Sequence, residues 1–480
     1  MSDSFRTTKI LITVGPSTHD HDTVCELINQ GVDGFRFNFS HGEIDQHLEI
    51  LSMIRECARN QNRTVACLAD LQGPKIRLGK LSDDPLYLAE GSDVILAYEE
   101  ELPDYSGSNP VLPIDYKHIT DDLKTGDTVF LNDGQIKLTV ETEKKNHLEA
   151  HVNIGGNIWS RKGVNIPTTE LTVPALTEKD REQLEMIVEE DFDLVALSFV
   201  RRAEDVEPAR GIINNTGEAI DLVAKIESRI ALDNLDGIID QVEGIMVARG
   251  DLGAEIGSER VPFQQKMMIE KANSRGKFVV TATQMLESMI EHPTPTRAEV
   301  SDVANAILDG SDVLMLSGET AVGEFPVEAA TTMKQIIRDT EDDFYDTMTA
   351  EGTEMDCDER KMAVAMSNAA AKVAREVEAS AIVAPTASGS TARFMSNTYP
   401  GCPVLVPSFN KKTRQKTAIY RNVTPIKLKK ITNTDRLMDE AVRLAQESEV
   451  ADTGDQIVLI TGLPITEPGV TNFLHVLDVE

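Results

Sequence analysis

Apolar runs of strand length alternate with amphipathic stretches along most of the chain, and each apolar run ends on polar residues. The first run covers residues 9–14, a helix-like pattern covers about 22–30, and the next run, GFRFNFS, ends near Ser40. A second helix pattern over 44–61 precedes the strand TVACLADL, and after an interruption a helix pattern over 178–190 resumes the alternation. Five more strands complete the series: DLVALSF, DLVAKIE, GIMVAR, KFVVTAT and DVLML. Eight βα units, three before an insertion and five after it, predict a (β/α)8 barrel rather than an open sheet.

Two further domains are predicted from changes in this pattern. Between about residues 75 and 170 the chain shows short alternating segments, in which Asp133-Gly134 is typical of a hairpin turn. They predict a β-rich insertion, either a lid that excludes water from the barrel or a decoration without a chemical role. After Asp342 an acidic segment predicts a solvated linker, and a helix over 361–377 then leads into a doubly wound α/β domain. The predicted domains are a barrel of residues 1–72 and 171–345, a lid of 73–170, and a C-terminal domain of 346–480.

Barrels of this kind carry their chemistry at the C-terminal ends of the strands, so the polar residues there are candidate site residues. They are Arg36, Asn38, Ser40, Asp70, Lys225, Glu227, Arg249, Gly250, Asp251, Thr283, Gln284, Ser317, Gly318 and Glu319. In VAKIES, a strand that continues to Glu227 places Lys225 and Glu227 on one face, roughly 7 Å apart. This pair suits a metal held by the carboxylate beside a cation that neutralises a transferring phosphate or an enolate. The alternative is an ordinary surface ion pair at a strand end.

Composition and charge narrow the class of partner. The chain has 480 residues, no apolar run of membrane-spanning length, and no apolar signal-peptide core in MSDSFRTTK, so we expect a cytoplasmic protein. A formal net charge of −33 argues against nucleic acid or an anionic membrane as a partner, because both need a basic face. An anionic ligand would instead require a few placed Arg and Lys side chains and a divalent metal.

The cysteines give no sign of a disulfide framework or a zinc site. They lie at positions 25, 57, 67, 357 and 402, without CxxC spacing and without an accompanying histidine cluster. This spacing favours buried free thiols.

A second candidate site lies in the C-terminal domain, where a strand is followed by the hydroxyl-rich turn Thr386-Ala387-Ser388-Gly389-Ser390-Thr391 and then by a helix. Hydroxyls and free backbone N–H groups at the start of a helix form a nest for phosphate. A plain capping turn is the alternative, and it would need one hydroxyl.

Taken together, eight segments resemble pyruvate kinase, and the resemblance covers essentially the whole chain. In order they are RFNFSHG, ADLQGPKIR, KGVNIP, AKIES, MVARGDLG, TATQMLESM, TRAEVSDVANAILDGSD and LSGETAVGEFP. The resemblance implies transfer of the phosphoryl group of phosphoenolpyruvate to ADP, which gives pyruvate and ATP. It also implies a homotetramer.

The resemblance implies roles for many of these candidates. Glu227 and Asp251 would hold Mg²⁺ or Mn²⁺, and Lys225 would stabilise the transferring phosphoryl group and the enolate. The N–H groups of Gly250 and Asp251 and the Thr283 hydroxyl would bind the substrate carboxylate. Phosphate oxygens would be bound by Arg36, Arg77 and the lid residue Lys162. Asn38 and His41 would lie near the nucleotide. Thr283, Glu319 and water would take part in protonating the enolate.

One departure from the family concerns the monovalent cation. Many pyruvate kinases bind K⁺ through residues that resemble Asn38, Ser40 and Asp70, with a threonine and a glutamate nearby; this chain has Leu71 and Lys75 at those two positions. An ammonium in place of the glutamate would supply the positive charge, so we expect activity without K⁺. The alternative is a Lys75 side chain that points to solvent.

A second departure concerns the effector. The turn over 386–391, with Thr386, Ser388, Gly389, Ser390 and Thr391, resembles the family's sugar-phosphate loop. However, the last loop, GLPITEPGVTN, lacks the Arg or Trp that in some members holds a second phosphate. We therefore expect a sugar monophosphate activator, such as ribose 5-phosphate, or none.

Two other functions remain open from the sequence. A metal-dependent aldolase or lyase acting on a pyruvate enolate could reuse Lys225, Glu227 and Asp251, but it would not need Arg77 or Lys162. A catalytically silent sugar-phosphate sensor would use only the C-terminal domain.

Overall fold

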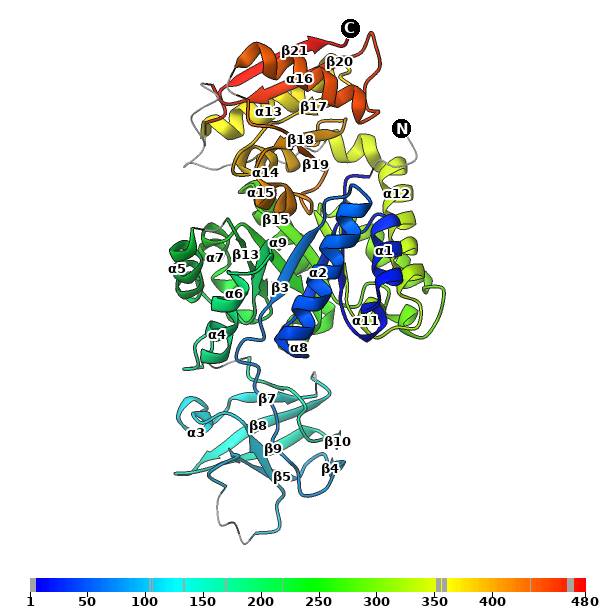
Figure 1. Cartoon of the computed structure of the whole chain (residues 1–480). Helices are drawn as coiled ribbons and strands as arrows, with labels where there is room; N and C mark the ends of the chain where they lie inside the picture. Colours follow the sequence, from blue (N-terminus) through cyan, green and yellow to red (C-terminus); the bar gives the residue numbers. More distant parts are fainter. Residues whose placement is uncertain are drawn as a thin grey trace.

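The computed structural model describes residues 6–102, 105, 107–132, 134–167, 169, 171–217, 219–350, 355, 361–431, 433–463 and 470–480, except for the side chains of 344–350. Three bodies follow one another along the long direction of the molecule, with a barrel in the middle (Figure 1). The β-rich insertion lies at one end of the barrel and the C-terminal sheet at the other.

The central body is a closed barrel of parallel strands, as predicted. Around the barrel the strands follow the order β1-β16-β15-β14-β13-β12-β3-β2. Their bounds are β1 (Lys9–Thr13), β2 (Gly34–Asn38), β3 (Ala66–Asp70), β12 (Leu194–Leu197), β13 (Asp221–Ile226), β14 (Gly244–Ala248), β15 (Phe278–Ala282) and β16 (Val313–Leu316). Nearly every residue in them is buried, which explains why the sequence shows continuous apolar runs rather than strict alternation.

Helices surround this barrel. Their bounds are α1 (His21–Asn29), α2 (Ile44–Asn60), α4 (Glu178–Ile187), α5 (Glu207–Thr216), α6 (Arg229–Asp233), α7 (Leu235–Gln241), α8 (Arg249–Ile256), α9 (Val261–Ser274), α10 (Arg297–Leu308), α11 (Gly318–Ala321) and α12 (Pro326–Ala350), with short 3₁₀ turns η1 (Pro16–Thr18), η2 (Ala203–Asp205), η3 (Ser258–Arg260) and η4 (Glu287–Ile290). The helix starts follow local capping chemistry: Thr177 and Thr296 each form a capping box with the acid three residues later. No helix among the described residues combines the length and the apolar character that a bilayer-spanning segment requires.

The insertion between β3 and α4 is built of strands, as predicted. A six-stranded sheet has the order β11-β7-β8-β9-β5-β6, and β10 pairs with β4. The bounds are β4 (Leu86–Leu88), β5 (Asp93–Tyr98), β6 (Val111–Ile114), α3 (Ile119–Asp122), β7 (Thr128–Leu131), β8 (Ile136–Glu143), β9 (Leu148–Ile154), β10 (Gly156–Ile158) and β11 (Val164–Asn165). The predicted hairpin joins β7 to β8, and Gly134 takes a φ of +85° there, whereas Asp133 lies outside the described residues.

The C-terminal domain is an α/β sheet with the order β19-β18-β17-β20-β21. Its elements are α13 (Lys361–Glu376), β17 (Ala381–Val383), α14 (Ser390–Ser396), β18 (Val404–Ser408), α15 (Lys411–Thr417), β19 (Val423–Lys427), α16 (Thr434–Glu447), β20 (Gln456–Thr461) and β21 (Phe473–Asp478). Three of its four strand pairings are parallel, and at the edge β21 runs antiparallel to β20. The doubly wound prediction is therefore confirmed, with one reversed edge strand.

The predicted linker after Asp342 begins too early. Helix α12 continues through this acidic segment to Ala350. Glu341 anchors it, because its buried carboxylate accepts hydrogen bonds from the backbone N–H groups of Thr7 and Thr8 at 2.8 and 2.7 Å. Acidity alone does not end a helix when a carboxylate has such partners. Residues 351–354 and 356–360 lie outside the described part of the chain.

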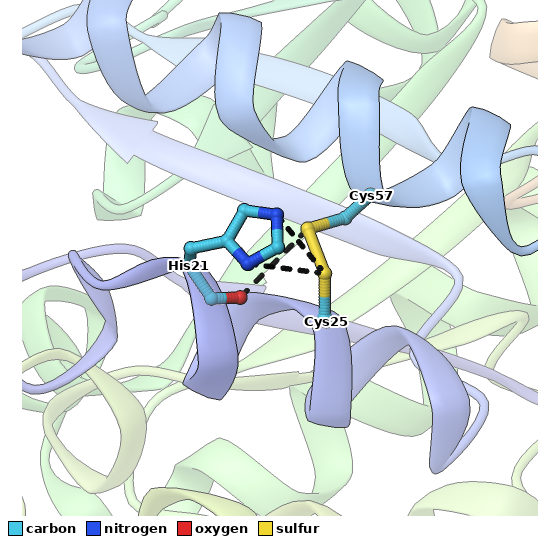
Figure 2. A group of neighbouring side chains, drawn as sticks. All are labelled: His21, Cys25 and Cys57. Carbon is cyan, nitrogen blue, oxygen red and sulfur yellow. Dashed lines mark hydrogen bonds between the residues drawn. A yellow bond between two sulfur atoms is a disulfide. The ribbon is translucent and has the colours of Figure 1, made fainter.

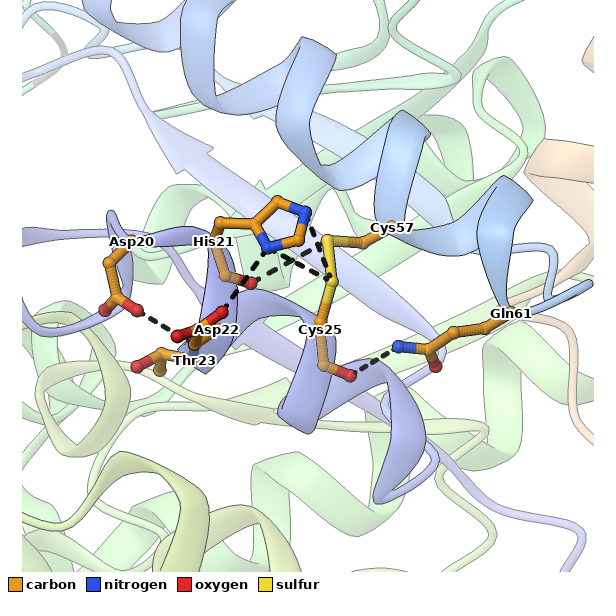
Figure 3. The surroundings of a disulfide bond; sticks show 7 residues. All are labelled: Asp20, His21, Asp22, Thr23, Cys25, Cys57 and Gln61. Atoms are coloured by element: carbon orange, nitrogen blue, oxygen red, sulfur yellow. Dashed lines mark hydrogen bonds and ion pairs between the residues drawn. A yellow bond between two sulfur atoms is a disulfide. The ribbon is translucent and has the colours of Figure 1, made fainter.

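The prediction of free thiols is wrong for two cysteines. Cys25 of α1 and Cys57 of α2 form a disulfide with their Cα atoms 5.3 Å apart, and the Gln61 side chain donates to the Cys25 carbonyl at 2.8 Å (Figure 3). The two cysteines meet because α1 and α2 lie side by side, a contact that spacing along the chain does not reveal. Cys67 and Cys402 are free and buried, as predicted, and Cys357 lies outside the described residues.

Buried ion pairs join the C-terminal domain to the N-terminal end of the barrel. Asp221, the first residue of β13, accepts hydrogen bonds from the Lys416 ammonium at 2.6 Å and from the Tyr420 hydroxyl at 2.5 Å. The side chains of Lys416 and Asp221 are 9% and 4% exposed. Since burial removes both charges from water, each depends on the other for its stability.

We expect the substitution Lys416→Met to destabilise the protein, because Asp221 would keep a buried charge with only a hydroxyl to bind it. The expected loss is about 3–5 kcal/mol in the free energy of unfolding, measured by urea denaturation. Lys427→Met, at an exposed position in β19, serves as the control. Adding Asp221→Asn to Lys416→Met should recover part of the loss; an unchanged midpoint in the single variant would contradict the role of the pair.

Candidate active site

Lys225 lies at the centre of a polar cluster at the C-terminal end of the barrel, which we call the mouth. Its ammonium lies 2.9 Å from Glu227 Oε1 and 3.3 Å from Asp70 Oδ1, and it donates a hydrogen bond to Ser198 Oγ at 2.7 Å. The Lys225 side chain is 12% exposed and the two carboxylates are each 1% exposed. The alternative of a surface ion pair is therefore excluded.

The charges in this cluster support one another. Burial by itself lowers the pKa of Lys225, but the carboxylates of Asp70 and Glu227 outweigh it and raise the pKa to about 12. For Asp70, burial acts to raise the pKa of the carboxyl group. The neighbouring cations Lys225 and Arg36 outweigh this effect and bring the pKa below its ordinary value. For Glu227, burial prevails and raises the pKa, with the Lys225 ammonium opposing and the Asp251 carboxylate adding to the rise. At neutral pH Lys225 therefore stays a fixed cation.

Arg36 extends the cluster toward β2. Its guanidinium binds Asp70 Oδ2 through Nε at 2.7 Å and Nη2 at 2.6 Å, and Nη1 donates to Thr13 Oγ1 at 3.2 Å. Asp70 therefore sits between two cations. Among the other residues predicted for a monovalent cation, Asn38 accepts from the Ser40 N–H at 3.2 Å, whereas the Leu71 side chain lies in the core.

Lys75 does not point freely into solvent. Its ammonium lies 3.1 Å from Asp251 Oδ1 at the start of α8. Glu227 and Asp251 are close enough to influence each other's charge, and an ammonium pairs with each of them. The carboxylate oxygens of Glu227 and Asp251 are hard donors of the kind that a small divalent metal ion prefers. These two residues therefore fit such an ion.

The segment after β15 holds an unusual backbone at the same mouth. Thr283 and Gln284 take φ values of 67° and 54°, a left-handed conformation that is costly for a β-branched residue such as Thr. The conformation turns the Thr283 hydroxyl toward α8, where Oγ1 accepts a hydrogen bond from the Gly250 N–H at 2.9 Å. Phe199, whose N–H donates to Glu227 Oε2 at 2.7 Å, also has a positive φ, of 54°.

Two buried side chains hold this segment in place. Arg249 donates through Nη2 to the carbonyls of Thr283 at 2.7 Å and Gln284 at 3.0 Å, and its Nη1 pairs with Asp302 at 2.7 Å. Glu319 is fully buried and accepts from the backbone N–H groups of Leu286 at 3.0 Å and Ser317 at 2.7 Å. Both of its oxygens are thus engaged by backbone.

The lid residues lie on adjacent segments. Arg77 is bridged to Gly163, next to Lys162, and the Arg77 guanidinium donates to the Arg161 carbonyl at 3.2 Å. Lys162 is exposed. Gly134 of the lid approaches Ala254 of α8, so the tip of the insertion touches the mouth. His41 is exposed and its carbonyl accepts from the His47 ring at 2.9 Å.

Two residues at the mouth were missed by the sequence reasoning. Ser198 follows β12 and binds the Lys225 ammonium; its position at the end of DLVALSF was the available signal. Glu255 of α8 lines the cleft with Lys75, and burial together with the charges of Asp251 and Glu227 raises its pKa to about 7. No periodicity distinguishes Glu255 from an ordinary helix-surface acid.

The hydroxyl-rich turn of the C-terminal domain lies at the N-terminus of α14. Gly389 takes a φ of +93° and its N–H donates to Thr386 Oγ1 at 3.0 Å, and the hydroxyls of Ser388 and Ser390 are 3.2 Å apart. Thr391 is buried and its hydroxyl pairs with that of Thr471 at 3.1 Å.

A pocket opens over this turn. It is lined by Thr386, Ser388 and Ser390 and, on the facing side, by Lys429 and Lys430. These lysines were also missed; the signal was the basic run KLKK in a strongly acidic chain. Two cations and three hydroxyls form a surface complementary to an anion.

The fold and the mouth together define an enzyme of the (β/α)8-barrel class, with an inserted β lid and a cationic, carboxylate-bearing site at the strand ends. The family model for the pyruvate kinase barrel domain matches residues 5–330, and that for the pyruvate kinase alpha/beta domain matches residues 364–477.

Individual pyruvate kinases are similar to this chain along nearly its full length. The chain is 40% identical to pyruvate kinase of Clostridium acetobutylicum over 477 residues, covering 98% of this chain and 99% of that protein. It is 38% identical to pyruvate kinase of Thermotoga maritima, covering 99% and 100%. The crystal structure of a pyruvate kinase from Cryptosporidium parvum matches with a TM-score of 0.91 at 33% identity, covering 99% of this chain and 96% of that chain. The chain therefore belongs to the pyruvate kinase family, which makes it a phosphotransferase.

Proposed function

We propose that Lys225 is the residue on which transfer of the phosphoryl group from phosphoenolpyruvate to ADP depends most. The observation that carries this role is its buried, permanently charged ammonium between Asp70 and Glu227. A cation held there in advance stabilises charge on the transferring group and on the enolate without reorganising. Arg36, fixed by Asp70, adds a second cation for the phosphate oxygens.

Glu227 and Asp251 would hold the divalent ion, Mg²⁺ or Mn²⁺, which when bound neutralises the charge of the phosphoryl group and substrate. The N–H groups of Gly250 and Asp251 at the start of α8, with the Thr283 hydroxyl, would bind the substrate carboxylate. Within this proposal Lys75 and Lys225 exchange part of their contact with the two carboxylates for contact with the substrate.

The other predicted residues fit supporting roles. Arg77 and Lys162, side by side on the lid, would bind phosphate oxygens when the lid closes, and Asn38 and His41 would lie toward the nucleotide. For protonation of the enolate, Glu319 is poorly placed, because both of its oxygens bind backbone N–H groups. The Thr283 hydroxyl, which donates to the Ala282 carbonyl at 2.6 Å, and a water are the remaining candidates.

The rival readings have less support. An aldolase or lyase is not favoured by the family match along the full chain, and a silent sensor would not need the Lys225 cluster. Assembly as a homotetramer and a cytoplasmic location stay predictions, as do the domain boundaries.

Lys225→Met should lower kcat by several orders of magnitude with little change in the KM for phosphoenolpyruvate, because the lost contact is made mainly in the transition state. The measurement is pyruvate formation from phosphoenolpyruvate and ADP with Mg²⁺. Lys80→Met, at an exposed lysine, is the matched control. Turnover near that of the control would remove Lys225 from the mechanism, provided that circular dichroism shows both variants folded.

We further propose that the enzyme works without K⁺. The support is the Lys75 ammonium, which lies 3.1 Å from Asp251 at the mouth, together with the two cations that already flank Asp70. These fixed charges supply locally what a bound monovalent cation would supply. Leu71, with its side chain in the core, offers no side-chain oxygen for such an ion.

Lys75→Glu should make activity depend on K⁺, because it replaces the fixed cation by a carboxylate. We expect equal rates with and without K⁺ for the parent protein, and a several-fold stimulation by K⁺ for the variant, at saturating Mg²⁺ and substrates. Lys80→Glu makes the same change of charge at an exposed position. Stimulation of the parent protein itself would refute the proposal.

We also propose that a sugar monophosphate binds in the pocket over residues 386–391 and activates the enzyme. The hydroxyls of Thr386, Ser388 and Ser390 would hold the phosphate, with Lys429 and Lys430 as counter-charges. Gly389, with its positive φ, lets the backbone approach the ligand closely. A plain capping turn would account for Thr386 but not for the two lysines.

Ribose 5-phosphate should raise the rate at low phosphoenolpyruvate, and Ser390→Asp should abolish this response, because a carboxylate repels the phosphate. Thr453→Asp, in an exposed turn of the same domain, should respond like the parent protein. The measurement is the initial rate across a titration of the sugar phosphate. A response confined to fructose 1,6-bisphosphate would be evidence against a monophosphate site.

A further inference from the structure

A cluster of soft ligands lies away from the barrel mouth, on the outer helices α1 and α2. His21 and Cys25 are one turn apart on α1, and Cys57 faces them from α2 (Figure 2). Cys25 Sγ lies 3.7 Å from His21 Nε2 and 3.9 Å from Nδ1. A ring nitrogen of His21 and the sulfur atoms of Cys25 and Cys57 all lie within 4.8 Å of one another.

The distance between the His21 nitrogen and the Cys25 sulfur suits a shared metal ion. For bonds of about 2.0–2.1 Å to nitrogen and about 2.3 Å to sulfur, a tetrahedral ion places the two atoms roughly 3.6 Å apart. The spacing between Nε2 and Cys25 Sγ agrees with this value. His21 Nδ1 lies 3.5 Å from Asp22 Oδ1, and a carboxylate at Nδ1 favours the tautomer that leaves Nε2 available as a ligand.

The two sulfur atoms can bind a metal ion only when the disulfide is reduced. Sulfur atoms bonded to each other are not thiolates, and thiolates are the ligands that soft divalent ions select. Reduction by two small thiols gives the Cys25 and Cys57 thiols and one small disulfide. Binding of the ion then releases the two thiol protons. Oxidation by a small disulfide reverses both steps.

We propose that His21, Cys25 and Cys57 form a redox-gated site for a thiophilic divalent cation such as Zn²⁺, closed by the disulfide and opened by its reduction. His21 is exposed and Cys25 half-buried, so the ion enters from the His21 side. Gln61 joins the end of α2 to the Cys25 carbonyl of α1, and Asp20 caps α1 at the N–H of Thr23; neither contact involves the sulfur atoms. The site differs from the barrel mouth, whose oxygen ligands suit a hard cation.

The test is titration of the full chain with Cd²⁺ in excess Mg²⁺, followed by the ultraviolet charge-transfer absorbance of cadmium thiolates. The chain is first reduced with a phosphine, which itself offers no thiol, and is then desalted without oxygen. We expect one Cd²⁺ per chain with the absorbance of two thiolates. Treatment with oxidised glutathione should remove this absorbance and protect Cys25 and Cys57 from alkylation, as read by peptide mass spectrometry.

Variants separate the three ligands. Cys25→Ser and Cys57→Ser should each lose the two-thiolate absorbance, and His21→Ala, which keeps both thiols, should weaken Cd²⁺ binding by roughly tenfold or more. Cys402→Ser, which removes a buried thiol elsewhere, is the control and should bind like the parent protein. If a serine variant does not fold, the His21→Ala comparison still decides.

Three results would overturn the proposal. They are absorbance in the reduced parent protein no greater than in Cys57→Ser, unchanged Cd²⁺ affinity in His21→Ala, and alkylation of both Cys25 and Cys57 after treatment with oxidised glutathione.

Discussion

The buried ammonium of Lys225 is the contact on which the rest of the mouth depends. Asp70 and Glu227 come from different strands, and neither could keep a charge so far from water without a cation beside it. Lys225 contacts both and is itself kept charged by both. Closure of the barrel brings these three side chains together, so the stability of the mouth and its electrostatic field have the same origin.

Strained backbone around this cluster is held by the buried side chains of Arg249 and Glu319. Left-handed conformations at Phe199, Thr283 and Gln284 each cost of the order of 1–3 kcal/mol. The hydrogen bonds of Arg249 to two consecutive carbonyls, and those of Glu319 to two N–H groups, offset part of this cost. The Thr283 hydroxyl consequently has a fixed direction before any ligand binds, so this part of the site is preorganised.

The sequence was sufficient where local pattern and strand-end position carry the information. The order of barrel strands, the hairpin of the lid, and the meeting of Lys225 with Glu227 follow from periodicity and from the rule that strand ends share one edge. It was insufficient where a contact depends on how two elements turn toward each other. The rotation of α1 against α2 decides that Cys25 meets Cys57, and the side-chain path of Lys75 decides that it reaches Asp251 rather than solvent. Glu341 shows the same limit, because an acidic segment remains helical where a distant backbone binds it.

Strand β13 also connects the mouth to the C-terminal domain through direct contacts. At its first residue, Asp221 binds Lys416 of α15 and Tyr420 just beyond that helix, and near its last residue Lys225 enters the mouth. Helix α15 in turn reaches the hydroxyl-rich turn, since Thr413 Oγ1 donates to the Ala387 carbonyl at 2.7 Å and Gly389 packs against Thr417. The pairing at Asp221 therefore lies in a short series of direct contacts that runs from the hydroxyl-rich turn through α15 to β13, and its buried charges are little screened by salt.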